Sequence, residues 1–523
     1  MTSSPRAALA ALLLALAALP GCLTSGELQC AAGLSKCANT CVAIQTDTNN
    51  CGSCGSACNG GNVCVAGGCV CPTGQQVCNG VCTALGTDPR NCGSCGYVCG
   101  TGQACNQGVC EDCGSGGCRT ALVAGCIATP GGYLQRIHDL PGGLLLDAPA
   151  NPAGASFPDA LGVLGSVLLY ADHDSSSLFE IPIASLGNAS AAHPSLVGPT
   201  TGSKAGTTQL SVATSDGGTL LYATTSNVNA IRIFNGPPVV DAGTLLANGS
   251  GSLGLVAAGG AAFDAGSFPE PFAAIGNEIF VPLNGTGQVL RVNVANPASA
   301  QLVATYDLQP LVAALPGGGV APDGGPFIAS PTQAIARNGY VYVAANVLRY
   351  YADFSGADYG PPLVAKIDPG ASDGGAVTAV TALAGTGSLD AGIPCQNVEW
   401  LANLPLGAVA TPMLVSCAGA RTYDADFNVT SVTNTALVLL DPRDQPVGFW
   451  IPSARPDGRF PPSVGRAVPQ NTSVYVADET AGRLYVVDYT SNGFVERVGF
   501  RNGLSPPTIC PSYITDLTVV PAP

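Results

Sequence analysis

The 523-residue sequence predicts an all-β chain, a seven-bladed β-propeller closed by its own N- and C-terminal strands and preceded by two small disulfide-rich modules. Three observations predict it. Beyond residue 120, paired apolar segments recur at intervals of 52 to 73 residues. Between residues 30 and 110, an eight-cysteine pattern recurs with a shift of 41 residues. The composition holds 68 glycines and 41 prolines but only 10% charged residues, which favours turns and strands over solvated helices.

The N-terminus has the layout of an export signal. Arg6 precedes an uncharged apolar run from Ala7 to Leu19, which is too short to span a bilayer as a helix. The sequence LPGC at 19–22 resembles the lipobox of bacterial lipoproteins, and this resemblance implies cleavage before Cys22 and lipidation of that residue. The alternative is an ordinary cleaved signal with Cys22 in a disulfide. The total of 23 cysteines favours lipidation, because an even number remains to pair without Cys22.

These features predict an exported protein that its lipid holds at the outer membrane or the cell surface. The net charge is −15, and a surface for nucleic acid would need clustered basic residues, so nucleic acid is not an expected partner. The same acidity repels anionic lipid, so the membrane contact is assigned to the N-terminal lipid alone. The expected organisation is a signal peptide over 1–21, a lipid-anchored tether over 22–29, cysteine-rich repeats over 30–70 and 71–111, a junction over 112–119 and the propeller over 120–523.

The cysteine pattern between residues 30 and 110 predicts two tandem modules of about 40 residues. The first set is Cys30, Cys37, Cys41, Cys51, Cys54, Cys58, Cys64 and Cys69, and the second is Cys71, Cys78, Cys82, Cys92, Cys95, Cys99, Cys105 and Cys110. A unit of this size buries too little apolar surface to fold alone. Outside the cytosol, disulfides supply the missing constraint at roughly 2–4 kcal/mol each. We therefore expect four bridges per module, with their connectivity left open.

Two other interpretations of the repeated CGSC motif are a zinc site and a redox dithiol. The region holds no histidine, and no helical period surrounds the motif, which disfavours both. The frame C-x6-C-x3-C-x9-C-x2-C-x3-C-x5-C-x4-C with its NCGSCG core resembles the stigma-specific-protein-like cysteine-rich repeats, which also occur in tandem in bacterial lipoproteins. That resemblance covers 30–110 and implies a secreted module without catalytic residues.

Six segments beyond residue 120 share one pattern, an apolar strand, a turn and a second strand. They are SVLLYADHDSSSLFEIPI (166–183), TLLYATTSNVNAIRIF (219–234), EIFVPLNGTGQVLRVNV (278–294), YVYVAANVLRYY (340–351), PMLVSCAGA with ALVLLDP (412–420 and 436–442) and SVYVADETAGRLYVVDY (473–489). A period of this length with several short strands per unit is typical of propeller blades. The segments resemble NHL or YVTN-type propellers, and VYVADETAGRLYVVD is the closest copy.

The two ends of this region predict a seventh, shared blade. TALVAGC (120–126) matches the second strand PMLVSC (412–417), and CPSYITDLTVV (510–520) matches the first strand CQNVEWLANL (395–404). The C-terminus would then supply the inner strand and the N-terminus the outer three, which closes the ring and leaves no long exposed edge.

The cysteines of the propeller region fit the same scheme. Cys395 and Cys417 lie at the start of a first strand and the end of a second strand, and Cys510 and Cys126 occupy the same two places in the shared blade. We therefore expect the disulfides Cys395–Cys417 and Cys126–Cys510. A third pair, Cys113–Cys118, would bridge the junction.

No catalytic residues are predicted from motifs. The chain holds three histidines, His138, His173 and His193, and none stands in a recognisable catalytic motif. The densest polar cluster, YADHDSSS (170–177), falls in the loop between the second and third strands of a blade, and such loops gather around the central channel. The expected ligand rim is Asp172, His173, Asp174, Asn227, Asn284, Asn346, Asp478 and Glu479.

An oxygen-rich rim suits Ca²⁺ or a hydroxyl-bearing ligand, with Asp172 and Asp174 as possible metal ligands. The alternative is that these Asp and Asn side chains only cap turns. Trp400 and Tyr513, in matching first strands, are assigned to the core rather than to ligand stacking.

Two classes of function follow. The first is a lipid-anchored surface protein that acts as a binding or adhesion scaffold, takes a protein, peptide or glycan on its propeller face, and requires no cofactor, with Ca²⁺ possible. The alternative is a propeller hydrolase or lyase, lactonase-like, that uses a bound divalent cation. The sequence has no convincing cluster of carboxylates and histidines across several blades, which favours the first.

Overall fold

The computed structural model divides the chain into two compact units, 1–83 and 84–523. It describes residues 30, 33–38, 40–58, 62–71, 76–78, 81–83, 85, 91–98, 103–106, 109–112, 120–127, 131–140, 143–146, 157–164, 167–173, 177–183, 191–193, 206–215, 218–236, 256–315, 319–322, 324–351, 356–371, 376–380, 383, 392–404, 411–423, 429–453, 462–470, 472–478, 480–490, 493–497 and 508–520. Within these ranges no helix is long and apolar enough to cross a membrane.

The cysteine repeats fold as short hairpins with the same register in both copies. The hairpins are β1 (Ser35–Cys37) with β2 (Thr40–Val42), β3 (Val63–Val65) with β4 (Gly68–Val70), β5 (Gln76–Cys78) with β6 (Val81–Thr83), and β7 (Gln103–Asn106) with β8 (Val109–Asp112). Cys64 faces Cys69 in β3–β4, and Cys105 faces Cys110 in β7–β8, as the 41-residue shift requires. The first repeat holds the disulfides Cys30–Cys41, Cys37–Cys54, Cys51–Cys64 and Cys58–Cys69.

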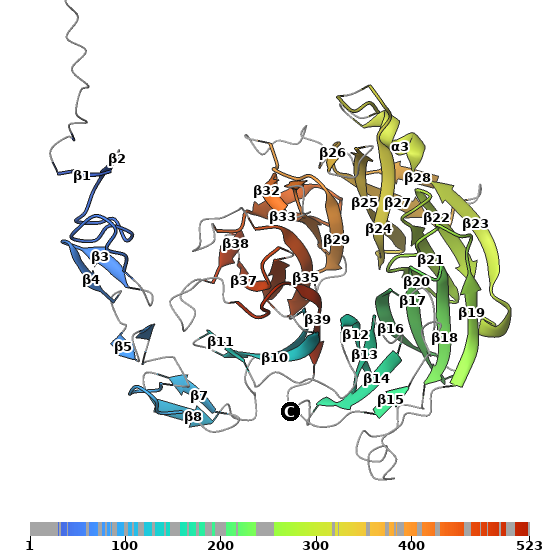
Figure 1. Ribbon diagram of the computed structural model, residues 1–523. Coiled ribbons are helices and arrows are strands. Elements are labelled where there is room, and N and C mark those ends of the chain that lie inside the picture. Colours follow the sequence, from blue (N-terminus) through green and yellow to red (C-terminus); the bar gives the residue numbers. More distant parts are fainter. Residues whose placement is uncertain are drawn as a thin grey trace, which may run out of the picture. The chain divides into compact units, whose positions relative to one another are not determined.

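The second unit contains seven antiparallel sheets that form a propeller ring, as the sequence predicts (Figure 1). The strands of each blade are given from the inner strand outwards. The first three blades are, in order, β12 (Pro158–Leu164), β13 (Val167–Asp172), β14 (Ser177–Pro182) and β15 (Ala191–His193); β16 (Thr207–Ser215), β17 (Gly218–Thr225), β18 (Ala230–Gly236) and β19 (Val256–Ala262); and β20 (Ala273–Ile275), β21 (Glu278–Leu283), β22 (Gln288–Asn293) and β23 (Gln301–Asp307).

The fourth to sixth blades are β24 (Ile328–Arg337), β25 (Tyr340–Tyr350), β27 (Leu363–Asp368) and β28 (Ala376–Ala379); β29 (Val398–Asn403), β30 (Met413–Cys417), β33 (Ala436–Leu440) and β34 (Pro446–Trp450); and β35 (Val464–Gln470), β36 (Ser473–Asp478), β37 (Arg483–Thr490) and β38 (Gly493–Glu496). The seventh blade is β39 (Ile514–Val520), β9 (Thr120–Ile127), β10 (Gly132–Leu140) and β11 (Gly143–Leu146).

Few other elements occur among the described residues of this unit. Strand β26 (Ala357–Tyr359) pairs with β25, and the hairpin β31 (Ala420–Tyr423) with β32 (Val429–Thr433) is inserted between β30 and β33. The helical elements are a 3-10 turn, η3 (Pro297–Ser299), and α3 (Gln309–Ala314).

The ring closes through the shared seventh blade. Strand β39 pairs antiparallel with β9, so that Ile514 faces Cys126 and Val520 faces Ala121. The disulfide Cys126–Cys510 joins the two ends of the propeller, and Cys395–Cys417 joins the equivalent positions of the fifth blade. Both expected pairs are therefore present. Cys22, Cys113 and Cys118 lie outside the described residues.

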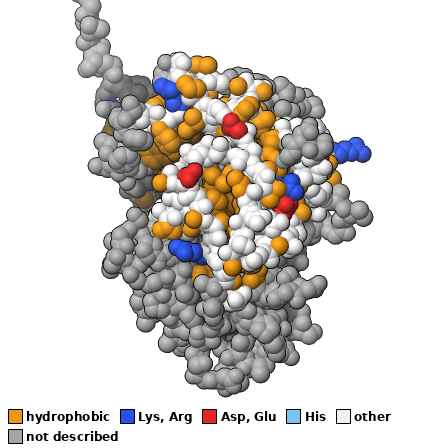
Figure 2. Space-filling view, turned by 90° about the vertical axis from the view of Figure 1, so that its right-hand side faces the viewer, with side chains coloured by type: hydrophobic (Ala, Val, Ile, Leu, Met, Phe, Trp, Pro, Cys, Tyr) orange, Lys and Arg blue, Asp and Glu red, His pale blue; other side chains and the backbone are white. Residues whose placement is uncertain are grey.

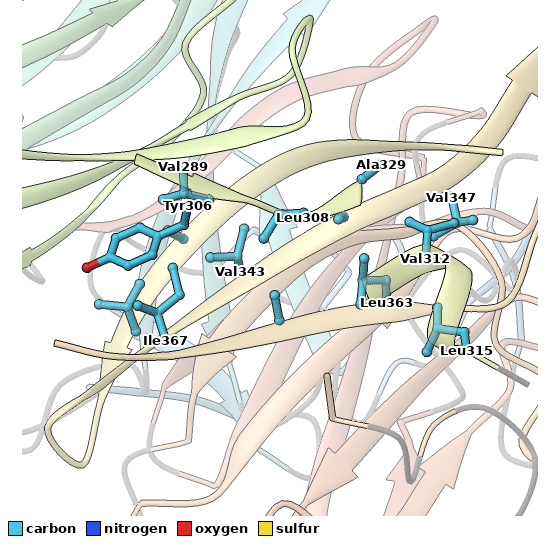
Figure 3. Close-up of a cluster of buried hydrophobic side chains, with 14 of the residues drawn as sticks. Val289, Tyr306, Leu308, Val312, Leu315, Ala329, Val343, Val347, Leu363 and Ile367 are labelled. Carbon is cyan, nitrogen blue, oxygen red and sulfur yellow. The ribbon is translucent and has the colours of Figure 1, made fainter. Parts of the chain in front are cut away.

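The core lies between neighbouring blades. The second strands β13, β30 and β36 are buried along their whole length, because each packs on a blade at either face, which explains their continuous apolar sequences. In one such cluster, Val343 of β25 and Leu363 and Ile367 of β27 pack with Val289 and Tyr306 of the preceding blade (Figure 3). The surface is poor in charge, and Figure 2 shows few charged side chains on the face that it draws.

Tyrosine hydroxyls connect two pairs of adjacent blades. Tyr475 of β36 donates a hydrogen bond of 2.6 Å to Asp139, which also forms an ion pair with Arg497 at 2.7 Å. Tyr342, the matching residue of β25, donates to Asp444 of the next blade at 2.9 Å. Asp139 lies near the end of the third strand of its blade, and Asp444 lies in the turn between the third and fourth strands of its blade. These buried or half-buried polar contacts therefore join each blade to the next.

Candidate functional site

β-Bulges aim one side chain of almost every inner strand into the centre of the ring. In six blades the pairing of the inner strand shifts, in five of them near its first residues, as between Pro158 and Ala160, and in β24 at mid-strand, between Pro331 and Gln333. A bulged residue leaves the ladder and turns its side chain in a new direction. The cavity-lining residues at these shifts are Asp159, Thr208, Thr332, Glu399, Arg466 and Thr515.

These side chains line a central cavity of about 610 Å³, to which all seven blades contribute. The third blade supplies Glu270 and Pro271, which precede its inner strand. Three aromatic residues, Phe157, Trp400 and Tyr513, complete the wall. The assignment of Trp400 and Tyr513 to the core is therefore corrected. Trp400 is only partly buried, because it lies beside the bulge of its inner strand, and Tyr513, which precedes the inner strand of its blade, is 37% exposed.

Asp159 and His173 form a polar pair in the cavity wall. The carboxylate Oδ2 of Asp159 lies 2.9 Å from Nδ1 of His173 and accepts a hydrogen bond of 3.1 Å from the backbone N–H of Thr207. Burial raises the pKa of Asp159 to about 7, although the adjacent imidazole lowers it.

The carboxyl groups of Glu270 and Glu399 interact electrostatically in the same cavity. Burial, and secondly the charge of Glu399, raise the pKa of Glu270 to about 8, so this group is mainly protonated at pH 7. Glu399 accepts a hydrogen bond of 2.8 Å from the Asn397 amide and lies 3.4 Å from the guanidinium of Arg421. Arg421 also donates to the hydroxyl of Ser463 at 2.7 Å.

The second arginine of the cavity is also paired. Arg466 forms an ion pair with the buried carboxylate of Asp516. Its guanidinium lies over the Trp400 ring, 4.5 Å from the ring centre, in a cation–π contact. Burial lowers the pKa of Arg466 to about 10, which leaves it charged at neutral pH. The cavity thus combines paired charges, one protonated carboxyl group and an aromatic wall.

The expected rim divides into residues that line the cavity and residues that do not. His173 and Asn227 line it. Asp172 and Asp478 are instead buried at the ends of second strands, where they accept backbone N–H groups of Phe157 at 2.7 Å and Ser463 at 3.3 Å. Cys126 and Cys417 occupy the same position in their blades. These aspartates therefore connect the second strand to the inner strand, as the disulfides do covalently elsewhere.

The remaining rim residues lie apart from the cavity or outside the described residues. The Asn284 amide donates a hydrogen bond of 3.2 Å to the carbonyl of Pro331 in the next blade. Asn346, expected in a loop, lies within strand β25 opposite Ser330, because that strand continues beyond its blade. Asp174 and Glu479 lie outside the described residues.

A close group of three possible metal-ligating side chains occurs once among the described residues, at Cys51, Cys58 and Cys69. All three cysteines are in disulfides, so they offer no thiolate ligand.

No protein-family model matches the chain, and no curated protein matches its sequence. The chain is similar in structure to a candidate 6-phosphogluconolactonase of Bacteroides fragilis, with 12% identity, a TM-score of 0.44, and 78% of this chain and 99% of that one covered. It is also similar to AztD of Citrobacter koseri, with 14% identity, a TM-score of 0.41, and 76% and 97% covered. Likenesses this distant say nothing of activity, and the propeller assignment rests on the strand pairing described above.

Proposed function

We propose that the chain is an exported, lipid-anchored surface protein whose propeller binds an uncharged glycan in its central cavity. The observation that carries this proposal is the charge balance of the cavity. Arg466 is paired with Asp516, and Arg421 is paired with Glu399. Burial raises the pKa of Asp159 to about 7, so this group is partly protonated at neutral pH, and a charged ligand would meet little uncompensated charge.

The other features of the cavity favour a sugar ring among uncharged ligands. Sugars present hydroxyl groups that both donate and accept, and the cavity offers carboxyl, amide and hydroxyl groups that do the same. The flat faces of sugar rings pack on aromatic side chains, and Trp400 and Tyr513 provide such surfaces. A volume of about 610 Å³ is within the ordinary range for small-molecule pockets.

Tryptophan fluorescence tests this proposal. The chain has two tryptophans, and Trp450 is buried against Tyr485, away from the cavity-lining residues. A Trp450→Phe variant would report on Trp400 alone. We expect a saturable change of its emission with at least one of glucose, galactose, mannose and N-acetylglucosamine or their oligomers. The proposal fails if none of them changes the emission at millimolar concentration.

A second candidate function, hydrolysis of a cyclic sugar ester, is favoured by the Asp159–His173 pair alone. A buried carboxylate that orients an imidazole suits the imidazole to accept a proton from water. The water oxygen would attack the ester carbonyl, the ring C–O bond would break, and the proton would pass to the departing alkoxide. We would then expect hydrolysis of glucono-δ-lactone above the spontaneous rate, lost in His173→Gln. A rate equal to the spontaneous one rejects this activity for that lactone.

A further inference from the structure

Two insertions of neighbouring blades meet beside the cavity, and we treat their two hairpins and the single bridge between them as one small sheet. Strand β25 continues past its blade and pairs with β26, so that Leu348 faces Tyr359 and Tyr350 faces Ala357. A single bridge between Gly356 and Thr422 then connects this hairpin to β31 of the next blade. Strand β31 pairs in turn with β32.

Pairing fixes which side chains share a face of this sheet. Directly paired residues lie on one face, and neighbours along a strand lie on opposite faces. Tyr350 therefore shares a face with Ala357 and Tyr359. Because Gly356 and Thr422 lie on the other face, their neighbours Arg421 and Tyr423 lie on the same face as the tyrosines. We call Tyr350, Tyr359 and Tyr423 the tyrosine face.

The tyrosine face is continuous with the cavity. Arg421 lines the cavity and alternates along β31 with Thr422, so Tyr423 is the next residue outward on its face. Burial, and secondly the nearby phenol of Tyr423, raise the pKa of Tyr359, so these two side chains lie close together. Tyr350, 55% exposed, lies close enough to Tyr423 and Glu399 for their charges to affect its titration.

We propose that the tyrosine face is a second subsite, which holds the sugar ring adjacent to the one in the cavity. This inference rests on the proposed function and names its ligand more closely, as an oligosaccharide rather than a single sugar. Tyrosine suits this role because its ring offers a flat apolar surface and its hydroxyl a hydrogen bond. The ligand would leave the cavity past the paired Arg421 and Glu399 and lie along Tyr423 and Tyr350.

The sheet provides a matched control on its opposite face. Tyr351 is the neighbour of Tyr350 and is 45% exposed, but its ring lies against Gly356, and its hydroxyl donates to Asp358 at 3.2 Å. Tyr350→Ala and Tyr351→Ala each remove an exposed tyrosine from the same strand end. They differ in the face that they alter.

In the experiment, the full chain carrying Trp450→Phe is titrated with each of the four monosaccharides named above and with the tetramer of each. The emission of Trp400 is the signal. We expect a tetramer to bind about tenfold more tightly than its monomer. Tyr350→Ala should remove that difference without changing monomer affinity, and Tyr351→Ala should retain it.

Two results separate the failure of this inference from the failure of the proposed function. If a monosaccharide binds but its tetramer binds no more tightly, or if the two alanine variants behave alike, the second subsite is rejected and the cavity site stands. If neither monomers nor tetramers change the Trp400 emission, the proposed function fails and this inference fails with it.

Discussion

The carboxylate of Asp159 lies 2.9 Å from the imidazole of His173 in the wall of the central cavity. Burial raises the pKa of this carboxyl group, and the imidazole lowers it. In the variant His173→Gln, we therefore expect the pKa of Asp159 to rise further above 7. A pH titration of ¹³C-carboxyl signals in aspartate-labelled protein, assigned with Asp159→Asn, measures it. An unchanged or lower pKa would mean that the imidazole carries no charge that Asp159 senses.

Glu270 predicts a pH dependence of stability. Its pKa in the folded protein is about 8, against an ordinary value of 4.5, so between these pH values the folded state keeps a proton that the unfolded chain has lost. The free energy of unfolding should therefore fall as pH rises from about 5 to about 8. Glu270→Gln should flatten this decline, as measured by urea unfolding at several pH values. The same slope in wild type and variant would contradict the raised pKa.

The ring-closing disulfide should stabilise the propeller more than the one within the fifth blade. Cys126 and Cys510 are 384 residues apart in sequence, whereas Cys395 and Cys417 are 22 apart. In the chain-entropy description, the longer loop adds about 2.5 kcal/mol over the shorter one. The double serine variant at 126 and 510 should therefore melt at a lower temperature than the matched variant at 395 and 417. Equal melting temperatures would show that loop closure does not determine the stability of the ring.

The contact between Tyr475 and Asp139 should stabilise the junction of the last two blades. Tyr475→Phe removes a hydrogen bond to a buried carboxylate, which should cost about 1–3 kcal/mol in the free energy of unfolding. Tyr170 supplies the control, because its hydroxyl is buried without a hydrogen-bond partner among the described residues. Tyr170→Phe should be neutral or slightly stabilising. Denaturant unfolding compares the two, and equal losses would refute the special role of Tyr475.

The propeller could be predicted from sequence because its signals are local and repeated. Segments such as SVYVAD form fully buried second strands, whose continuous apolar runs recur in every blade. The shared blade and both disulfides followed from the alignment of those repeats. Asn346 was misplaced in a loop because β25 continues past its blade to pair with β26, and that pairing depends on partners distant in sequence.

The cavity could be predicted only in part. His173 and Asn227 follow second strands and could be placed near the channel, but most of the wall comes from bulged inner strands. A bulge reverses the side of the sheet that a residue faces, so Trp400, which the strand period places in the core, turns towards the cavity. A signal did exist, because polar residues such as Asp159 and Glu399 interrupt apolar inner strands near the same position.

Isothermal titration calorimetry at pH 7 with neutral sugars and their uronates, such as glucose with glucuronate and mannose with mannuronate, tests the balanced charge of the cavity most directly. We predict that a neutral sugar binds one site per chain and that its uronate binds more weakly, because Arg421 and Arg466 are already paired. Tighter binding of the uronates, or no heat with any sugar, would contradict the account.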